Sequence, residues 1–157
     1  MIILGIDPGI GRTGYAFLKH DGKNTELISC GCITTDSKTP GPQRLLEIKQ
    51  DLDALIKKFE PDSVCLETLF FQTNVKTAMA VGQARGVAIL ACAENKLKII
   101  ELSPLQVKIS ATGYGKADKS QVQKMVMTLL KLKKIPKPDD AADACAIAWA
   151  GIGRSSN

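Results

Sequence analysis

The chain opens with Met1–Gly14, MIILGIDPGIGRTG, and the interpretation of the whole sequence starts from this stretch. Ile2–Ile6 is a short run of apolar and β-branched residues, which is typical of a strand covered on both faces of a sheet. The run stops at Asp7, and a proline and three glycines follow it. Because a carboxylate at the end of a buried strand is costly unless a cation meets it, Asp7 predicts a positively charged ligand.

Composition bounds the remaining possibilities. The 157 residues are 45% hydrophobic, which is typical of a globular protein, and we expect a single domain over residues 1–157. No apolar run approaches the roughly 18 residues that cross a bilayer. The apolar start is too short for a signal peptide and lacks a basic segment before it. We therefore expect a cytoplasmic protein without membrane association.

Charge and the reactive side chains narrow the chemistry. The net charge of +5 is compatible with a polyanionic partner, although a solvated lysine surface gives the same value. The five cysteines contain no CxxC spacing, so we expect them to be reduced and buried. His20 is the single histidine, which removes most histidine-based metal sites and Ser-His or Cys-His catalysis.

The periodicity of apolar residues predicts an α/β fold. Three strands come first and form an antiparallel meander; two further strands then alternate with helices, and helices close the chain. The result is a mixed central sheet of about five strands flanked by helices. Beyond the first strand, we expect strands at Tyr15–Lys19, Glu26–Thr35, Ser63–Leu66 and Lys98–Leu102, and helices at Gln43–Phe59, Asn74–Glu94, from Ser103, at Asp118–Lys131 and from Asp139 or Asp140 to Trp149.

Carboxylates mark three boundaries between these elements. Asp7 follows the first strand, Glu67 follows the fourth, and Asp140 and Asp143 share one face at the start of the last helix. Each has an ordinary explanation as a turn or helix cap or as a surface charge. Together they favour a common site, because strands that end at one sheet edge form the usual ligand crevice.

Acids that converge repel one another and recruit cations. Without histidine or cysteine in the set, oxygen ligands suit Mg²⁺, with Mn²⁺ as a substitute. Two such ions about 4 Å apart catalyse phosphodiester hydrolysis in many enzymes. Lys108, Lys116 and Lys119 supply positive charge for a phosphate backbone near the last acidic pair.

Two segments resemble phosphate-binding motifs, but neither fits its motif in full. Gly9–Gly14 fits G-x-G-x-x-G, but it leads into a predicted strand, so no helix N-terminus is available for a pyrophosphate. Gly113–Ala117 contains a Gly-Lys pair but fails the phosphate-loop spacing at both ends.

Several segments together resemble the RuvC family of Holliday-junction resolvases. They are Gly5–Gly9 with Thr13–Tyr15, Gly82–Ala88, Lys119–Gln123 and Asp140–Ala144, and the resemblance spans nearly the whole chain. It implies an RNase H-like fold, a homodimer, and a divalent-metal endonuclease that nicks symmetric strands of four-way DNA junctions in recombination and repair. A branch-migration motor complex is a further expected partner.

The resemblance also implies roles for individual residues. Asp7, Glu67, Asp140 and Asp143 match the family's acidic tetrad, which holds the metal ions and carries catalysis. Phe70 matches an aromatic near the crossover, where stacking on an unpaired base is physically sensible. Lys108 and Lys119 match basic positions near the scissile phosphate; with Lys116 and Arg85 they complete the expected DNA-binding set.

Two alternatives stay open at this point. A non-catalytic nucleic-acid-binding relative is disfavoured because all four acids are present. A phosphotransferase of the actin-like or sugar-kinase-like type shares an early Asp-x-Gly turn, but a chain this short lacks the second lobe that closes over a nucleotide.

Overall fold

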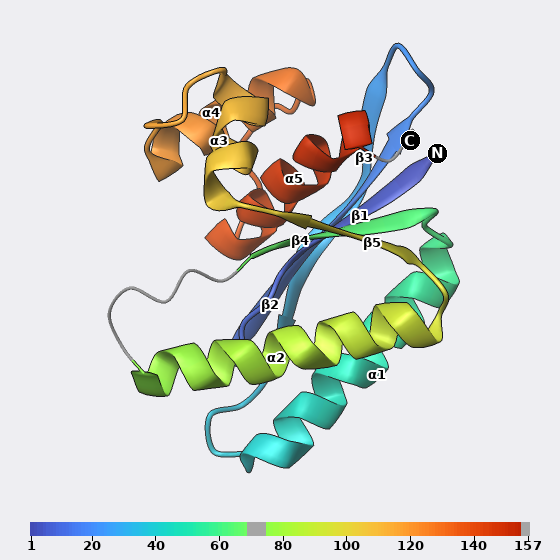
Figure 1. The fold of residues 1–157 in the computed structure, drawn as a ribbon, viewed down its shortest axis with the longest axis vertical. Coiled ribbons are helices and arrows are strands. Elements are labelled where there is room, and N and C mark those ends of the chain that lie inside the picture. The colour runs from blue at the N-terminus through green and yellow to red at the C-terminus, as the bar shows by residue number, and fades with distance from the viewer. Residues whose placement is uncertain (69–74, 155–157) are drawn as a thin grey trace.

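The computed structural model describes residues 1–68 and 75–154, and these residues build a five-stranded mixed sheet with helices on both faces (Figure 1). The strand order is β3-β2-β1-β4-β5. β1 pairs antiparallel with β2 and parallel with β4, and β5 runs parallel to β4. The strands are β1 Ile2–Asp7, β2 Arg12–His20, β3 Thr25–Thr34, β4 Ser63–Glu67 and β5 Lys98–Leu102.

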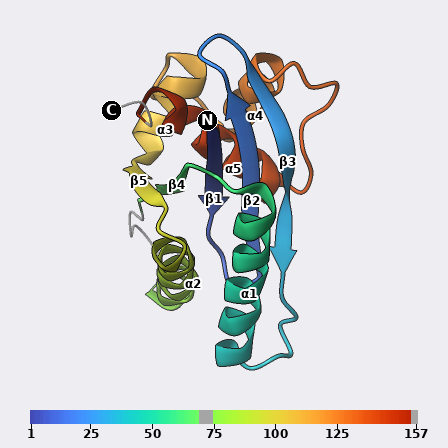
Figure 2. The ribbon, with the colours of Figure 1, turned by 90° about the vertical axis from the view of Figure 1, so that its right-hand side faces the viewer.

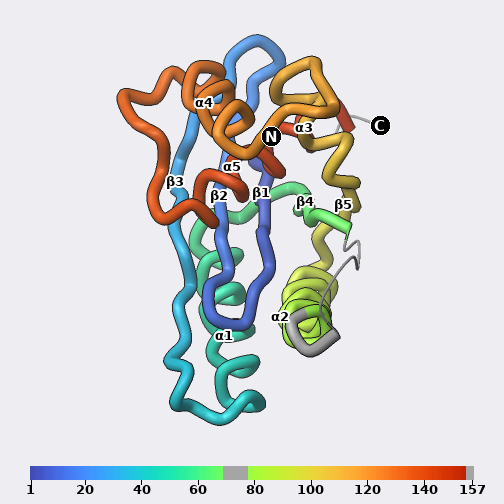
Figure 3. Tube along the Cα trace, turned by 90° about the vertical axis from the view of Figure 1, so that its left-hand side faces the viewer, coloured from blue at the N-terminus to red at the C-terminus, as the bar shows by residue number. Residues whose placement is uncertain are grey.

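The helices divide into two layers, which Figures 2 and 3 show on opposite sides of the sheet. α1 and α2 pack on one face and α3, α4 and α5 on the other, and each layer closes its own apolar core. The helices are α1 Gly41–Phe59, α2 Val75–Glu94, α3 Pro104–Thr112, α4 Lys119–Leu129 and α5 Asp139–Gly151. The α/β prediction, with its meander and about five strands, is confirmed.

The observed helix ends differ from the predicted ones by one or two residues, and the end of α4 has a clear physical cause. α4 ends at Leu129 rather than at Lys131, and Lys131 adopts a left-handed φ of 54°. The Leu132 amide donates to the Met127 carbonyl at 2.9 Å and the Lys131 amide to the Thr128 carbonyl at 3.0 Å, which closes the helix as a Schellman-type turn. Glycine usually occupies this turn, so a lysine there gives no sequence signal.

Helix α5 lies directly on the sheet because two strand positions carry no side chain. A Cβ atom at Gly5 of β1 would meet the Ala148 amide at 2.6 Å and would overlap the Ala144 carbonyl. At Gly14 of β2 it would overlap the Asp140 carbonyl. Real Cβ atoms do not approach so closely, so glycine at both positions sets the distance between α5 and the sheet.

The cysteine prediction holds in part. All five cysteines are free thiols, and Cys65, Cys92 and Cys145 are buried, whereas Cys30 and Cys32 on β3 are only half-buried. The membrane prediction is tested over the described helices alone: none of them is both long enough and apolar enough to cross a bilayer.

We predict that Gly5→Ala destabilises the fold by about 1–3 kcal/mol, because the added methyl group forces α5 away from β1. Urea unfolding measures the change. Gly41→Ala, at the first residue of α1, is the matched control, since a Cβ there meets nothing within 4 Å. Equal stability of Gly5→Ala and wild type would contradict the close contact.

Candidate active site

Strand pairing brings Asp7 and Glu67 side by side. β1 and β4 are parallel, and Ile6 lies opposite Leu66, so the next residue of each strand is a carboxylate. Side chains alternate between faces, and Ile3 and Cys65 pack in the core beneath α5. Asp7 and Glu67, which have the same parity as those two residues, therefore point toward the α5 side of the sheet.

Helix α5 supplies the third carboxylate. Its first turns carry Asp139, Asp140 and Asp143, and Gly14 lies directly beneath the Asp140 backbone. Asp7, Glu67 and Asp143 line one pocket of about 260 Å³. The other walls come from α3, α4 and α5 and include the side chains of Lys108 and Lys119. The pocket thus combines three acids with two lysines.

Burial and mutual repulsion disturb the acids. Burial, and then the charges of Asp143, Glu67 and Asp140, raise the pKa of Asp7 from its ordinary value of 3.8 to about 7. Burial and the charge of Asp143 also raise the pKa of Glu67. Both shifts show that the ionised forms of these carboxylates are disfavoured in the pocket. A bound cation would stabilise the ionised forms.

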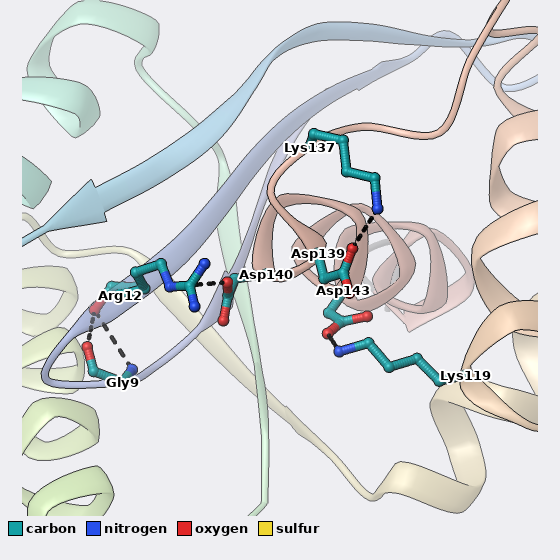
Figure 4. A network of polar contacts seen from close by, with 8 residues as sticks. Gly9, Arg12, Lys119, Lys137, Asp139, Asp140 and Asp143 are labelled. Atoms are coloured by element: carbon teal, nitrogen blue, oxygen red, sulfur yellow. Dashed lines mark hydrogen bonds and ion pairs between the residues drawn. The ribbon is translucent and has the colours of Figure 1, made fainter.

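Cationic side chains compensate Asp140 and Asp143 of α5 from different sides (Figure 4). The Lys119 Nζ lies 2.6 Å from the Asp143 Oδ2, and this hydrogen bond raises the pKa of Lys119. The Arg12 Nε lies 3.6 Å from the Asp140 Oδ2. Buried Gln123 donates its side-chain amide to the Asp143 Oδ1 at 3.1 Å, which orients that carboxylate further.

The turn after β1 is fixed by its own hydrogen bonds. The hydroxyl of Thr13, which is only 1% exposed, donates to the Gly9 carbonyl at 2.8 Å. The Thr35 hydroxyl donates to the Ile10 carbonyl at 2.5 Å and accepts from the Arg44 Nε at 2.8 Å. Asp7 therefore stands at the entrance of a braced turn, and the Gly9–Gly14 segment enters β2 rather than a helix, as expected.

The four predicted acids come together, but not as one closed ligand set. Asp7, Glu67 and Asp143 share the pocket, while Asp140 lies beside it, near enough to raise the pKa of Asp7. Over residues 1–68 and 75–154, no three acidic, cysteine or histidine side chains stand close enough to enclose a metal ion. The ion pairs with Lys119 and Arg12 hold two of the acids instead.

The predicted DNA-binding residues lie in different surroundings. Lys108 and Lys119 line the pocket, and Lys116 is exposed on the loop between α3 and α4. The Arg85 side chain is only 17% exposed: its Nη2 lies 2.8 Å from the Glu101 Oε2, and its Nε donates to the Glu67 carbonyl at 3.3 Å. Phe70 lies outside the described residues.

The sequence prediction missed two residues of this site, Arg12 and Gln123. Gln123 follows Lys119 by four positions on α4, so the two side chains share a helix face and both reach Asp143. The four-residue spacing on a predicted helix could therefore have indicated Gln123. Nothing in the sequence indicates Arg12, because its contact with Asp140 joins residues that are distant in sequence.

This sheet, with carboxylates at the ends of β1 and β4 and at the start of the helix above them, defines an α/β protein of the RNase H-like class. The family model "Crossover junction endodeoxyribonuclease RuvC" matches residues 3–150. The RuvC of Alkaliphilus oremlandii is 53% identical over 148 residues, covering 94% of this chain and 90% of the relative. The chain therefore belongs to the RuvC family of crossover junction endodeoxyribonucleases.

Solved structures agree with this assignment. The Thermus thermophilus RuvC structure superposes with a TM-score of 0.88 at 33% identity, covering 96% of this chain and 92% of that one. A second structure, T. thermophilus RuvC in complex with a Holliday junction substrate, superposes with a TM-score of 0.87 at 30% identity and the same coverage. The RNase H-like prediction is confirmed.

We predict that metal-free wild-type protein loses stability between about pH 4 and pH 7. Because folding raises the pKa of Asp7 to about 7, the folded state binds more protons than the unfolded state in this window, so rising pH favours unfolding. Asp7→Asn removes this loss and is more stable than wild type at pH 8 by up to about 4 kcal/mol.

Urea unfolding at pH 5 and pH 8, with a chelator present, measures the effect. Asp139→Asn is the control, because Lys137 lowers the pKa of Asp139 and its loss cannot produce a change of this sign. The same pH dependence in wild type and Asp7→Asn would rule out Asp7 as its source.

Proposed function

We propose that this chain is a structure-selective endonuclease that resolves four-way DNA junctions. It would hydrolyse phosphodiesters with a divalent metal and place paired nicks on symmetric strands, in recombination and repair. The single observation that carries the proposal is the pocket itself: Asp7, Glu67 and Asp143 face two lysines in a chain of the RuvC family. The Thermus relative in complex with a Holliday junction substrate supports the choice of DNA.

The chemistry of the donors fits Mg²⁺, with Mn²⁺ as a substitute and two ions per site, although the described acids would have to close around the ions. The donors are all carboxylate oxygens, which suit these hard cations. Burial and the neighbouring carboxylates raise the pKa of Asp7, and a bound cation would favour its ionised form. Asp7, Glu67 and Asp143 would hold the metal, joined by Asp140 in exchange for its ion pair with Arg12. When bound, divalent ions activate water and stabilise the leaving oxygen.

The chain's own side chains bind and orient the DNA strand. Lys108 and Lys119 line the pocket wall, where their charges attract the scissile phosphate. Water attacks the phosphorus, the bond to the 3′ oxygen breaks, and the strand ends as a 5′ phosphate and a 3′ hydroxyl. Gln123 keeps Asp143 oriented when Lys119 turns from that carboxylate toward a phosphate.

We predict that Asp7→Asn lowers junction cleavage at least about a hundredfold, because an amide is a poor ligand for Mg²⁺. Junction binding persists, since the lysines are unchanged. Cleavage of a labelled mobile four-way junction with and without Mg²⁺, beside a matched duplex, measures the first effect. Gel shift without metal measures the second, and Asp139→Asn is the matched control. Cutting by Asp7→Asn at the wild-type rate would overturn the proposal.

We also propose that α2 is the interface of a homodimer. One face of α2 packs on the sheet through buried alanines, and the opposite face presents Met79 and Leu90, which are 64% and 50% exposed. A Cβ atom at Gly82 or Gly86 would meet nothing within 4 Å, so this helix leaves room for close approach of a second copy. A symmetric cut on two strands needs two such pockets, one from each copy.

We predict that Leu90→Lys weakens the dimer at least about tenfold, because it places a charge in an apolar contact. Sedimentation over a concentration series measures the dissociation constant. Leu46→Lys is the matched control, since Leu46 is a similarly exposed leucine on α1, at 53%. A wild-type monomer at all concentrations, or equal weakening by both variants, would contradict this interface.

The remaining expectations stay predictions. Phe70, Lys116 and Arg85 are expected to contact junction DNA, and a branch-migration motor complex is an expected partner. The cytoplasmic location and the single domain over residues 1–157 are expectations of the same kind. Arg85 has a second candidate role, which is to support the end of β4. Its salt bridge to Glu101 and its hydrogen bond to the Glu67 carbonyl favour that role as directly as its charge favours DNA contact.

A further inference from the structure

The positive charge of the chain is concentrated in one part of the fold. Residues 104–137, which comprise α3, α4 and the loops after them, contain eight lysines and a single acid, Asp118. This segment, which we call the lysine lobe, has a net charge of +7, whereas the whole chain has +5. The other 123 residues therefore carry a net charge of −2, and the lobe accounts for the basic character of the protein.

The acidic pocket uses only part of this charge. Lys108 and Lys119 line it, but three lysines stand in the loop that leads from α4 to α5: Lys131, Lys133 and Lys134. All three side chains are exposed, and no carboxylate of the described residues lies within ion-pair distance of them. Three adjacent positive charges repel one another, so this arrangement costs free energy unless an anion meets it.

The loop is held in place at both ends. Its first residues close α4 through the Schellman-type turn at Lys131. Its last residues include Pro136 and Pro138, which restrict the backbone, and Lys137, whose Nζ lies 2.7 Å from the Asp139 Oδ1 at the start of α5. Figure 3 shows it as an extended loop beyond the edge strand β3, and Figure 2 shows the same loop beside β3 from the other side.

From these observations we infer that Lys131, Lys133 and Lys134 form a second phosphate-binding surface, which grips a duplex arm of the junction at a distance from the cut. Four consecutive residues span at most about 14 Å, enough for about three successive phosphates of one strand. The loop ends at Asp139, so a strand leaving the acidic pocket can follow the chain onto these lysines. The inference rests on the proposed function and adds to it where the DNA arm lies.

A duplex backbone fits this surface better than an anionic membrane does. The apolar residues among and after the three lysines, Leu132 and Ile135, are half-buried, so the loop offers charge without an exposed apolar side chain to enter a bilayer. The loop lysines belong to the same lysine lobe as Lys108 and Lys119, which line the pocket. A polyanion that threads the pocket therefore meets positive charge beyond it.

The test uses the full chain carrying Lys131→Gln, Lys133→Gln and Lys134→Gln. Binding to four-way junctions is measured without metal over a salt series. The slope of log K against log salt should fall by about 1 per lysine, hence by about 3 in total. Affinity should fall at least about tenfold for arms of about two helical turns, and little for arms of about half a turn.

Two comparisons separate this surface from general charge and from the active site. Lys23→Gln, Lys57→Gln and Lys96→Gln remove the same charge from exposed lysines outside the lobe, and this variant should keep the wild-type slope. Single-turnover cleavage at saturating protein should match wild type in both variants, because the acidic pocket is untouched. A normal far-ultraviolet circular dichroism spectrum confirms that each variant is folded.

The inference fails if the loop variant keeps the wild-type slope, if the control variant loses as much, or if arm length makes no difference. It also fails if the loop lysines govern binding to phosphatidylserine vesicles and not to DNA. A wild-type protein that binds junctions through these lysines but cuts none contradicts the proposed function and still supports this surface.

Discussion

The contact between α5 and the bare backbone of β1 and β2 is the constraint on which the rest of this structure depends. Gly5 and Gly14 let the helix rest on the sheet, and a side chain at either position would overlap the helix backbone. Since Asp140 and Asp143 lie in the first turns of α5, this distance also sets how near they come to Asp7. Close packing of a helix thus creates the electrostatic problem of the site.

Neighbouring side chains partly compensate the negative charge of these acids. Lys119 and Gln123 hold Asp143, and Arg12 holds Asp140, while Asp7 keeps a pKa near 7. A divalent ion would have to compete with these ion pairs, so the lysine and the arginine act as exchangeable counter-charges. In the proposed function, an ion that bound these acids would free the same cations for the phosphates of the DNA.

Charge is also separated on a larger scale. The four acids of the site lie at the ends of β1 and β4 and at the start of α5. The lysine lobe, with a net charge of +7, contributes Lys108 and Lys119 to the same pocket. An anionic backbone is repelled by the acids and attracted by the lobe, so in the proposed function the lobe would set the side from which DNA approaches. The same separation explains why a modest total charge of +5 is compatible with strong local attraction to a polyanion.

The sequence alone determined the α/β class and four of the five strands to within one residue at either end, because alternation and apolar runs are local properties. It also indicated the four acids, since each stands where a regular element begins or ends. The early end of α4 escaped it, because the turn at Lys131 lacks the usual glycine.

Only the tertiary structure decided how these residues meet. The partnership of Arg12 with Asp140 crosses from β2 to α5, and no local periodicity encodes it. Asp140 lies beside the pocket, rather than in it, because its backbone rests against Gly14 of β2. Sequence patterns specify which residues face the core and which lie at the ends of helices and strands. Distances between separate elements depend on packing, which is decided only when the whole chain has folded.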